Sequence, residues 1–319
     1  MKKNKILVTG ANGFIGQAIL NHLKEIKNTH AFGSVRQIRI SANSNIPLIE
    51  IGDLNEETDW SDALSGVDIV IHSAARVHVM NDQSADPIAE FRKTNVAGTL
   101  NLAHQAIAAG VRRFLFISSI KVNGENTELG KPFTADDVPT PSDPYGISKL
   151  EAEQGLLRLA AETGLEVVII RPVLVYGPGV KANFLSMMRW LSKGIPLPLG
   201  AIYNKRSLVA LDNLIDLIVT CLDHPAAKNQ VFLVSDGEDL STTELLRRMG
   251  VALGKPARLL PLPASWLDLV AALLGKRNVT RRLCETLQVD TSKTRKLLGW
   301  QPPLSVDQGL KKAAEGLTK

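Results

Sequence analysis

The chain has 319 residues, of which 45% are hydrophobic and 22% are charged, and its formal net charge is +5. The length allows one large domain or two, the composition is ordinary for a soluble globular protein, and no apolar stretch approaches the twenty residues of a transmembrane helix. The two cysteines, Cys221 and Cys284, are far apart and form no C-x-x-C motif. This argues against a metal cluster and fits a reducing cytoplasm.

Two charged regions of the sequence bear on targeting and on charged partners. The basic N-terminus leads into a short apolar run and a glycine turn, so it predicts a first strand and not a signal peptide. The later basic residues favour solvated helix faces first and a site for a phosphate-bearing ligand second. No recognised base-reading module accompanies them, so we expect no nucleic-acid partner.

The first element is a buried strand at 6–8 that runs into the turn Thr9-Gly10-Ala11-Asn12-Gly13-Phe14-Ile15-Gly16 and then into a helical pattern at 17–23. Gly10 allows a tight turn, Gly13 lets the backbone approach a pyrophosphate, and Gly16 lets the helix pack close to the strand. The spacing is G-x-x-G-x-x-G and not G-x-G-x-x-G. Since similar turns also occur with no ligand, the turn alone favours a dinucleotide site without deciding it.

Apolar strands and helical patterns then alternate along the chain. Strands are predicted at 30–36, 48–53, 67–75, 114–119 and 166–172, and helices at 88–109 and 148–163. This alternation predicts an α/β fold, a Rossmann-type doubly wound parallel sheet. Ligands bind beyond the carboxyl ends of such strands, where Gly10, Asp53, Ala74, Ser119 and Pro172 are expected.

The pattern changes after Pro172, where glycines and prolines crowd 176–179 and 194–198. We therefore expect a dinucleotide-binding domain at 1–172 and a smaller C-terminal lobe at 173–319 that binds the substrate, and we allow their segments to interleave.

Tyr145 and Lys149 stand at i and i+4, so a helix that begins there places both on one face. A lysine ammonium beside a phenol lowers the pKa of the phenol, and such a tyrosine is a general acid or base near neutral pH. Ser119, at a strand end, is placed to hydrogen-bond the same substrate oxygen. A lone Y-x-x-x-K is weak, but with the glycine turn and the serine it predicts a redox active site.

With these motifs in order, the chain resembles the extended short-chain dehydrogenase/reductases of the nucleotide-sugar epimerase/dehydratase type. Further matching segments are 53–54, 72–75, 95–99, 118–119, 171–172 with 176–179, and 298–300. The resemblance implies Tyr145 as catalytic acid/base, Lys149 as the residue that binds the nicotinamide ribose and tunes Tyr145, and Ser119 as the group that polarises the substrate oxygen. It also implies a homodimer.

The resemblance further implies a set of cofactor-binding residues. Asp53 would lie near the adenine amino group, Ala74 and Ala75 would line the cleft, and Asn95 would support the site from the fourth helix. The complete expected set is Gly10, Asn12, Gly13, Phe14, Ile15, Gly16, Arg36, Asp53, Leu54, Ala74, Ala75, Asn95, Tyr145, Lys149 and Pro172.

The second strand indicates which dinucleotide is used. An acid that holds the ribose 2′-hydroxyl of NAD should stand about twenty residues beyond the glycine turn. The strand at 30–36 ends without one, and Arg36 follows Val35. A guanidinium suits a 2′-phosphate, so NADP(H) is preferred, with NAD(H) as the alternative if Arg36 only stacks on adenine.

The residues after Ser119 narrow the range of reactions that this site could catalyse. The 4,6-dehydratases of the family carry an Asp-Glu pair there, whereas this chain has Ile120-Lys121, which argues against a dehydratase. The whole pattern is most similar to bacterial surface-polysaccharide enzymes that reduce the C4 ketone of a UDP-4-keto-6-deoxy-N-acetylhexosamine with NADPH. The alternative is an NAD-dependent UDP-sugar C4 epimerase, and the non-enzyme alternative is a dinucleotide-binding regulator.

The C-terminal lobe should hold the nucleotide diphosphate. The resemblance implies Asn183 and Arg206 as substrate-binding residues, with Arg282 or its neighbour Arg281 as a second clamp. Residues 265–277 are apolar and then basic, which is typical of a helix that packs on its own lobe and, less often, of one that touches a membrane.

Overall fold

The computed structural model describes residues 4–38, 46–77, 86–263, 266–267 and 283–317. Its centre is a seven-stranded sheet in the order β3-β2-β1-β4-β5-β6-β9, in which every neighbouring pair is parallel. The strands are β1 (Asn4–Thr9), β2 (Thr29–Val35), β3 (Leu48–Glu50), β4 (Ile69–His72), β5 (Arg113–Ile117), β6 (Glu166–Pro172) and β9 (Gln230–Val234). The predicted doubly wound parallel sheet is confirmed.

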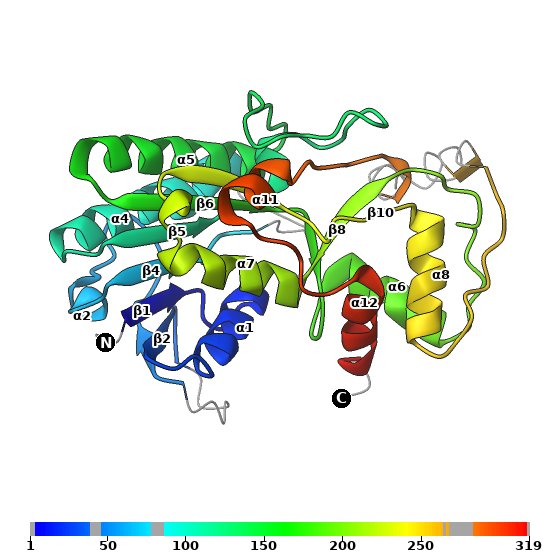
Figure 1. Ribbon diagram of the computed structural model, residues 1–319, viewed down its shortest axis with the longest axis horizontal. Coiled ribbons are helices and arrows are strands. Elements are labelled where there is room, and N and C mark those ends of the chain that lie inside the picture. Colours follow the sequence, from blue (N-terminus) through cyan, green and yellow to red (C-terminus); the bar gives the residue numbers. More distant parts are fainter. Residues whose placement is uncertain (1–3, 39–45, 78–85, 264–265, 268–282, 318–319) are drawn as a thin grey trace.

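Two hydrophobic layers cover the sheet. On one face, Ile6, Val8 and Ile71 pack with apolar residues of α1 (Phe14–Leu23), α7 (Leu211–Asp223) and α11 (Ser292–Leu298). On the other face, Leu7, Val70 and Phe114 pack with α2 (Ser61–Leu64), α4 (Gly98–Ala108) and α5 (Pro144–Thr163). Alternate residues of one strand thus enter opposite cores, which explains why these strands are apolar at nearly every position. Figure 1 shows the helices above and below the sheet.

A smaller lobe lies beside the sheet, at the right of Figure 1. Its three-stranded sheet has the order β10-β8-β7, with β7 (Leu174–Tyr176), β8 (Arg206–Ala210) and β10 (Asp239–Leu240). Apolar residues of α6 (Ala182–Ser192), α8 (Thr242–Ala252) and α12 (Val306–Glu315) form its core. Elements from beyond residue 172 also belong to the larger sheet and its cover, namely β9, α7 and α11. The boundary at residue 172 stays a prediction.

Several predicted elements have different ends. The helix expected at 88–109 is divided into α3 (Pro87–Arg92), a π-helix (Lys93–Ala97) and α4. The strand expected at 114–119 is β5, which ends at Ile117, because Ser119 caps a short 3-10 helix (Ile120–Val122). A further 3-10 helix spans Pro225–Ala227. The helix expected from 148 begins at Pro144, so Tyr145 lies in its first turn.

Within the described residues, no helix is both long enough and apolar enough to cross a membrane. Most of the predicted segment 265–277 lies outside the described residues.

Candidate active site

The glycine turn at the end of β1 is closely packed against backbone. Gly10 has a φ of +69°, and a Cβ there would lie 2.9 Å from the Cα and N of Ala74. A Cβ on Gly16 would lie 2.2 Å from the carbonyl oxygen of Gly10. Gly13 donates its N–H to the Gly10 carbonyl, 2.8 Å away, and begins α1 without a side-chain cap. A turn with bare backbone at a helix N-terminus fits the diphosphate of a dinucleotide.

Arg36 and Asp53 lie together beyond the ends of β2 and β3. The Nε of Arg36 is 2.8 Å from Oδ1 of Asp53, and the side chains are 77% and 73% exposed. Leu54 packs against α4, since a Cβ on Gly98 would lie 2.8 Å from the Leu54 Cγ. The ion pair was not predicted from the sequence. The predicted partner of Arg36 was a 2′-phosphate, and the predicted partner of Asp53 was the adenine.

A buried histidine connects the glycine turn to α4. His72 Nδ1 lies 2.7 Å from the Thr9 hydroxyl, and Nε2 lies 2.9 Å from the Thr99 hydroxyl. Thr9 also accepts the backbone N–H of Ala74. Burial lowers the pKa of His72 to about 3, and the charge of Lys149 contributes, so the ring is neutral at pH 7. The imidazole therefore acts as a structural link.

Asn95 connects the π-helix to the strand end and to α5. Its Oδ1 accepts the backbone N–H of Arg76, and its Nδ2 donates to the Arg76 carbonyl and to the Ser148 hydroxyl, each 3.0 Å away. Ser148 stands in α5 between Tyr145 and Lys149. Asn95 thereby holds the segment after Ala74 and Ala75 next to the helix that carries the predicted catalytic side chains.

Asp143 fixes the start of α5. Its side chain accepts the N–H of Gly146 at 2.6 Å, and Pro144 occupies the first helical position. This places Tyr145 beside Ser119, close enough for the serine hydroxyl to favour the ionised phenol. Desolvation raises the pKa of Tyr145 to about 12, the charge of Asp143 adds to the rise, and the Ser119 bond opposes it.

Lys149 is buried, and its ammonium is bonded to backbone. Its Nζ donates to the carbonyl of Ile117 at 2.9 Å and lies 4.3 Å from the centroid of the Phe116 ring. Burial lowers the pKa of Lys149 to about 7, and Glu153 opposes the shift. The expectation that Lys149 lowers the pKa of Tyr145 is wrong for this structure, because its ammonium is bonded to a carbonyl and desolvation dominates at Tyr145.

Glu153 extends the same face of α5 by one turn and anchors a buried network that sequence reasoning missed. Arg171 pairs with it through Nη2 at 2.5 Å and Nε at 3.0 Å, and the side chains are only 4% and 2% exposed. The Ser118 hydroxyl also donates to Glu153, and Arg171 donates to Asn123 at 2.9 Å. The four-residue spacing of Tyr145, Lys149 and Glu153 is the signal that could have revealed this network.

The predicted substrate-binding residues are less connected. Asn183 is exposed in the first turn of α6. Arg206 begins β8 and donates to the Glu285 carbonyl at 3.1 Å. Arg281 and Arg282 lie outside the described residues. Pro172 is the buried last residue of β6, paired with Val234.

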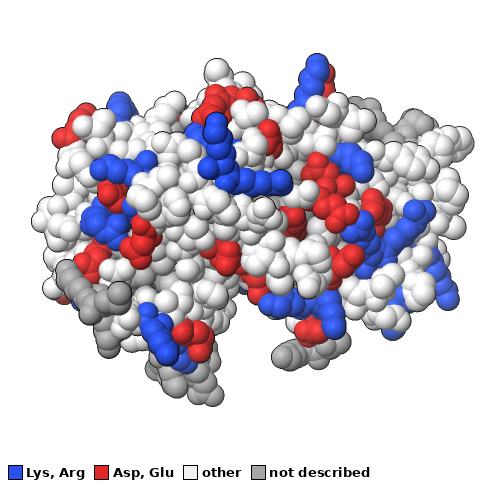
Figure 2. Space-filling model, viewed as in Figure 1, with Lys and Arg blue, Asp and Glu red and all other residues white. Residues whose placement is uncertain are grey.

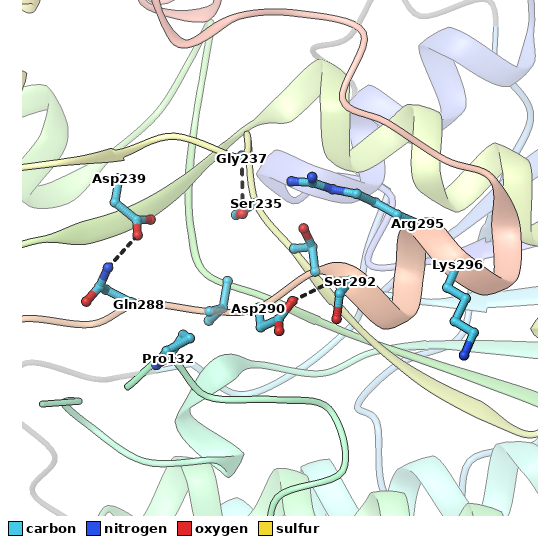
Figure 3. A pocket seen from close by; sticks show the side chains of 11 residues that line it. Pro132, Ser235, Gly237, Asp239, Gln288, Asp290, Ser292, Arg295 and Lys296 are labelled. Carbon is cyan, nitrogen blue, oxygen red and sulfur yellow. Dashed lines mark hydrogen bonds between the residues drawn. The ribbon is translucent and has the colours of Figure 1, made fainter. Parts of the chain in front are cut away.

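Two cavities lie away from Ser119, Tyr145 and Lys149, none of which lines either of them. One, of about 560 Å³, is a polar hollow between β10, the segment that carries Gln288, and α11 (Figure 3). The other, of about 640 Å³, lies between α1, α7 and α12 and reaches Asn12 and Phe14 of the glycine turn.

The described geometry agrees with a comparison against protein families. A model of the NAD dependent epimerase/dehydratase family matches residues 6–235. The chain belongs to this family. A Vibrio cholerae relative, named UDP-glucose 4-epimerase, is 51% identical over 311 residues, which cover 97% of this chain and 94% of the relative.

Solved structures of other family members share the fold. The UDP-glucuronic acid 4-epimerase of Bacillus cereus in complex with NAD has a TM-score of 0.78 at 23% identity and covers 98% of both chains. RMD from Pseudomonas aeruginosa, complexed with NADPH, has a TM-score of 0.73 at 22% identity and covers 99% of this chain and 100% of that one.

The resemblance to the epimerase/dehydratase family is thus confirmed, and the chain is an enzyme of this family. The narrower resemblance to 4-keto reductases is not confirmed, because the 51%-identical relative carries the name of an epimerase. Structures with this fold hold NAD in one case and NADPH in another.

Proposed function

We propose that the protein is an NAD-dependent UDP-sugar C4 epimerase, which is the alternative function that the sequence indicates. The 51%-identical relative named UDP-glucose 4-epimerase carries this proposal, because the likeness spans nearly the whole of both chains. The site supports it with the phenol of Tyr145 beside Ser119 and a glycine turn that fits a dinucleotide.

The roles follow from the contacts. A bound nicotinamide supplies hydride exchange with the sugar C4. Tyr145 takes the proton of the C4 hydroxyl and returns it, while Ser119 holds the same oxygen. The raised pKa of Tyr145 makes it a poor base unless positive charge comes near, so Lys149 must contribute charge or orientation when the site is filled. Epimerisation then requires the 4-keto sugar to offer its other face to the same groups.

A second candidate is the NADPH-dependent reductase of a UDP-4-keto-6-deoxy-N-acetylhexosamine. Arg36 favours it, because β2 ends without the acid that would hold an NAD ribose. The pairing of Arg36 with Asp53 weakens this argument, since the carboxylate neutralises the guanidinium and would repel a 2′-phosphate.

Incubation of the purified protein with UDP-glucose, without added reductant, separates the two candidates. We expect UDP-galactose to form, with a loss of at least about 100-fold in Tyr145→Phe, the low end of what general acid–base groups contribute. Tyr203→Phe, at an exposed tyrosine, is the matched control and should keep full turnover. Absence of epimerisation together with NADPH oxidation by the 4-keto sugar nucleotide would establish the reductase instead.

Direct binding measurements test the cofactor. We expect NADH to bind at least as tightly as NADPH in a fluorescence titration, and we expect Asp53→Asn to strengthen NADPH binding alone, because it frees the charge of Arg36. Arg36→Ala should remove that gain. A wild-type preference for NADPH that Arg36→Ala abolishes would restore the original assignment of NADP(H).

The cytoplasmic location, the homodimer and a role in supplying sugars for surface polysaccharides stay predictions. Sedimentation equilibrium of the purified protein tests the dimer.

A further inference from the structure

The far end of the smaller lobe exposes apolar side chains close together. They are Trp190 and Ile195 at the end of α6, Val251 at the end of α8, and Leu260 and Leu262 in the segment that follows, with exposed fractions of 46%, 42%, 78%, 52% and 41%. We call these five residues, with Arg189, Lys193, Lys255 and Arg258, the tip surface.

Hydrogen bonds show that the parts of the tip surface are adjacent. The N–H of Leu197 donates to the Arg258 carbonyl at 2.9 Å, and the N–H of Leu260 returns to the Leu197 carbonyl at 2.8 Å. Lys255 reaches the end of α6, where its Nζ donates to the Ser192 carbonyl at 2.7 Å. Beneath them, Leu191 and Leu197 are buried in the lobe's core, so the exposed residues sit on a packed base.

The charge of this region has one sign. Residues 181–203 and 245–263 contain no Asp or Glu, while Arg189, Lys193, Lys255 and Arg258 are all exposed. In Figure 2 the right-hand end of the molecule shows Lys and Arg side chains among uncharged atoms. Lys255 is bonded to a carbonyl and not to a carboxylate, so its charge is not neutralised by that contact.

We propose that the tip surface docks the enzyme on an anionic membrane surface. Tryptophan and aliphatic side chains insert at headgroup depth, and Lys and Arg bind lipid phosphates while their stems stay apolar. The cores of protein–protein interfaces are depleted in lysine, so the two lysines here favour lipid over a protein partner. The shared sign of the charges matches the anionic headgroups of such a surface. The proposal is independent of which sugar reaction the enzyme performs.

Vesicle flotation tests the proposal on the full-length protein. We expect flotation with phosphatidylcholine mixed with phosphatidylglycerol, little with phosphatidylcholine alone, and less as salt rises. Lys193→Glu with Arg258→Glu should lower binding at least about tenfold, because each basic residue near such a surface contributes about fivefold. Trp190→Ser should lower vesicle binding at low salt and at high salt alike.

Matched controls change the same charge and polarity elsewhere. Lys24→Glu with Lys27→Glu alters two exposed lysines just after α1, and Val138→Ser alters a side chain that is 83% exposed and lies outside the tip surface. Both should float as the wild type does. Each variant is first checked for an unchanged thermal unfolding midpoint.

Failure of the wild type to float with anionic vesicles overturns the proposal, as does equal flotation with both lipids or an equal loss in the controls. Sedimentation adds one more decisive outcome. If Trp190→Ser converts a self-associated wild type into a smaller species, the tip surface is an interface between copies of this chain, and the membrane proposal is wrong.

Discussion

Two glutamates on α5, two residues apart, form ion pairs in opposite environments. Glu151 pairs with Arg92 at 2.5 Å with side chains 30% and 52% exposed, whereas Glu153 and Arg171 are both almost fully buried. Water screens the Arg92–Glu151 pair, so this pair contributes little to the free energy of unfolding. Removing one partner of the second leaves an uncompensated charge beside Ser118 and Lys149.

Glu153→Gln should therefore lower the free energy of unfolding by about 3–5 kcal/mol, and Glu151→Gln by about 0–1 kcal/mol. Urea unfolding at pH 7 measures both. Similar losses in the two variants would mean that burial does not control the strength of these pairs.

His72 predicts a pH dependence of stability. Its pKa falls from an ordinary 6.5 to about 3 in the folded protein, so between these values the unfolded chain binds more protons. Stability should therefore fall as pH drops below 6.5, by up to about 1.4 kcal/mol per pH unit from this one group.

His72→Asn should be less stable at pH 7, through loss of the bonds to Thr9 and Thr99, and should show a flatter decline between pH 7 and pH 5. His22→Asn, at an exposed position on α1, should follow the wild-type slope. Parallel curves for all three proteins would show that His72 is not the titrating group.

At the scale of elements, the glycines of the turn differ in how closely the backbone packs around them. A Cβ on Gly16 would lie 2.2 Å from the Gly10 oxygen, but a Cβ on Gly13 would lie 3.1 Å from it. We expect Gly16→Ala to cost about 1–3 kcal/mol in stability and Gly13→Ala less, because the 2.2 Å contact forces a larger backbone shift than the 3.1 Å contact. Both should weaken NADH binding in a fluorescence titration. Normal NADH binding by both variants would remove the turn from the site.

The order of strands and helices could be predicted from the sequence because apolar runs and turn residues mark each element. The backbone around the predicted site agrees with the prediction at Gly10, Gly16 and the start of α5, and the roles of these residues stay predictions. Side-chain directions were not predictable from the sequence: Lys149 turns to the Ile117 carbonyl, and Arg36 meets Asp53 across two strand ends. The π-helix was missed because apolar spacing alone cannot distinguish one extra residue in a helix.

At the scale of the whole molecule, the two lobes share buried polar contacts. Asp236, just after β9, accepts bonds from Tyr176, from the Ala210 N–H and from Asn213, and Asn213 also bonds the Leu304 carbonyl. Strand β9 of the larger sheet thus leads directly into groups that fix β7, β8 and the start of α7. Neither lobe can unfold without exposing these groups.

We therefore expect one cooperative unfolding transition. Variants that keep only Trp60, buried in the larger lobe, or only Trp190, on the smaller lobe, with the other tryptophans changed to Phe, report the two regions separately. In each variant, the urea midpoint from tryptophan fluorescence should equal the urea midpoint from circular dichroism. A fluorescence midpoint for Trp190 below the circular-dichroism midpoint of the same variant would show that the smaller lobe opens alone.

The π-helix at 93–97 also limits how the length of this chain can vary. Five residues there close a wider turn than an α-helix would, and Asn95, in the middle of that turn, bonds Arg76 and Ser148. Such a turn absorbs one extra residue, so deleting one residue would restore a regular helix and leave α3 and α4 in their present register. The deletion should therefore keep the packing of α4 and lose the bonds of Asn95. Insertions and deletions should be tolerated in the loops of this protein, but not at this point in its longest helical run before α5.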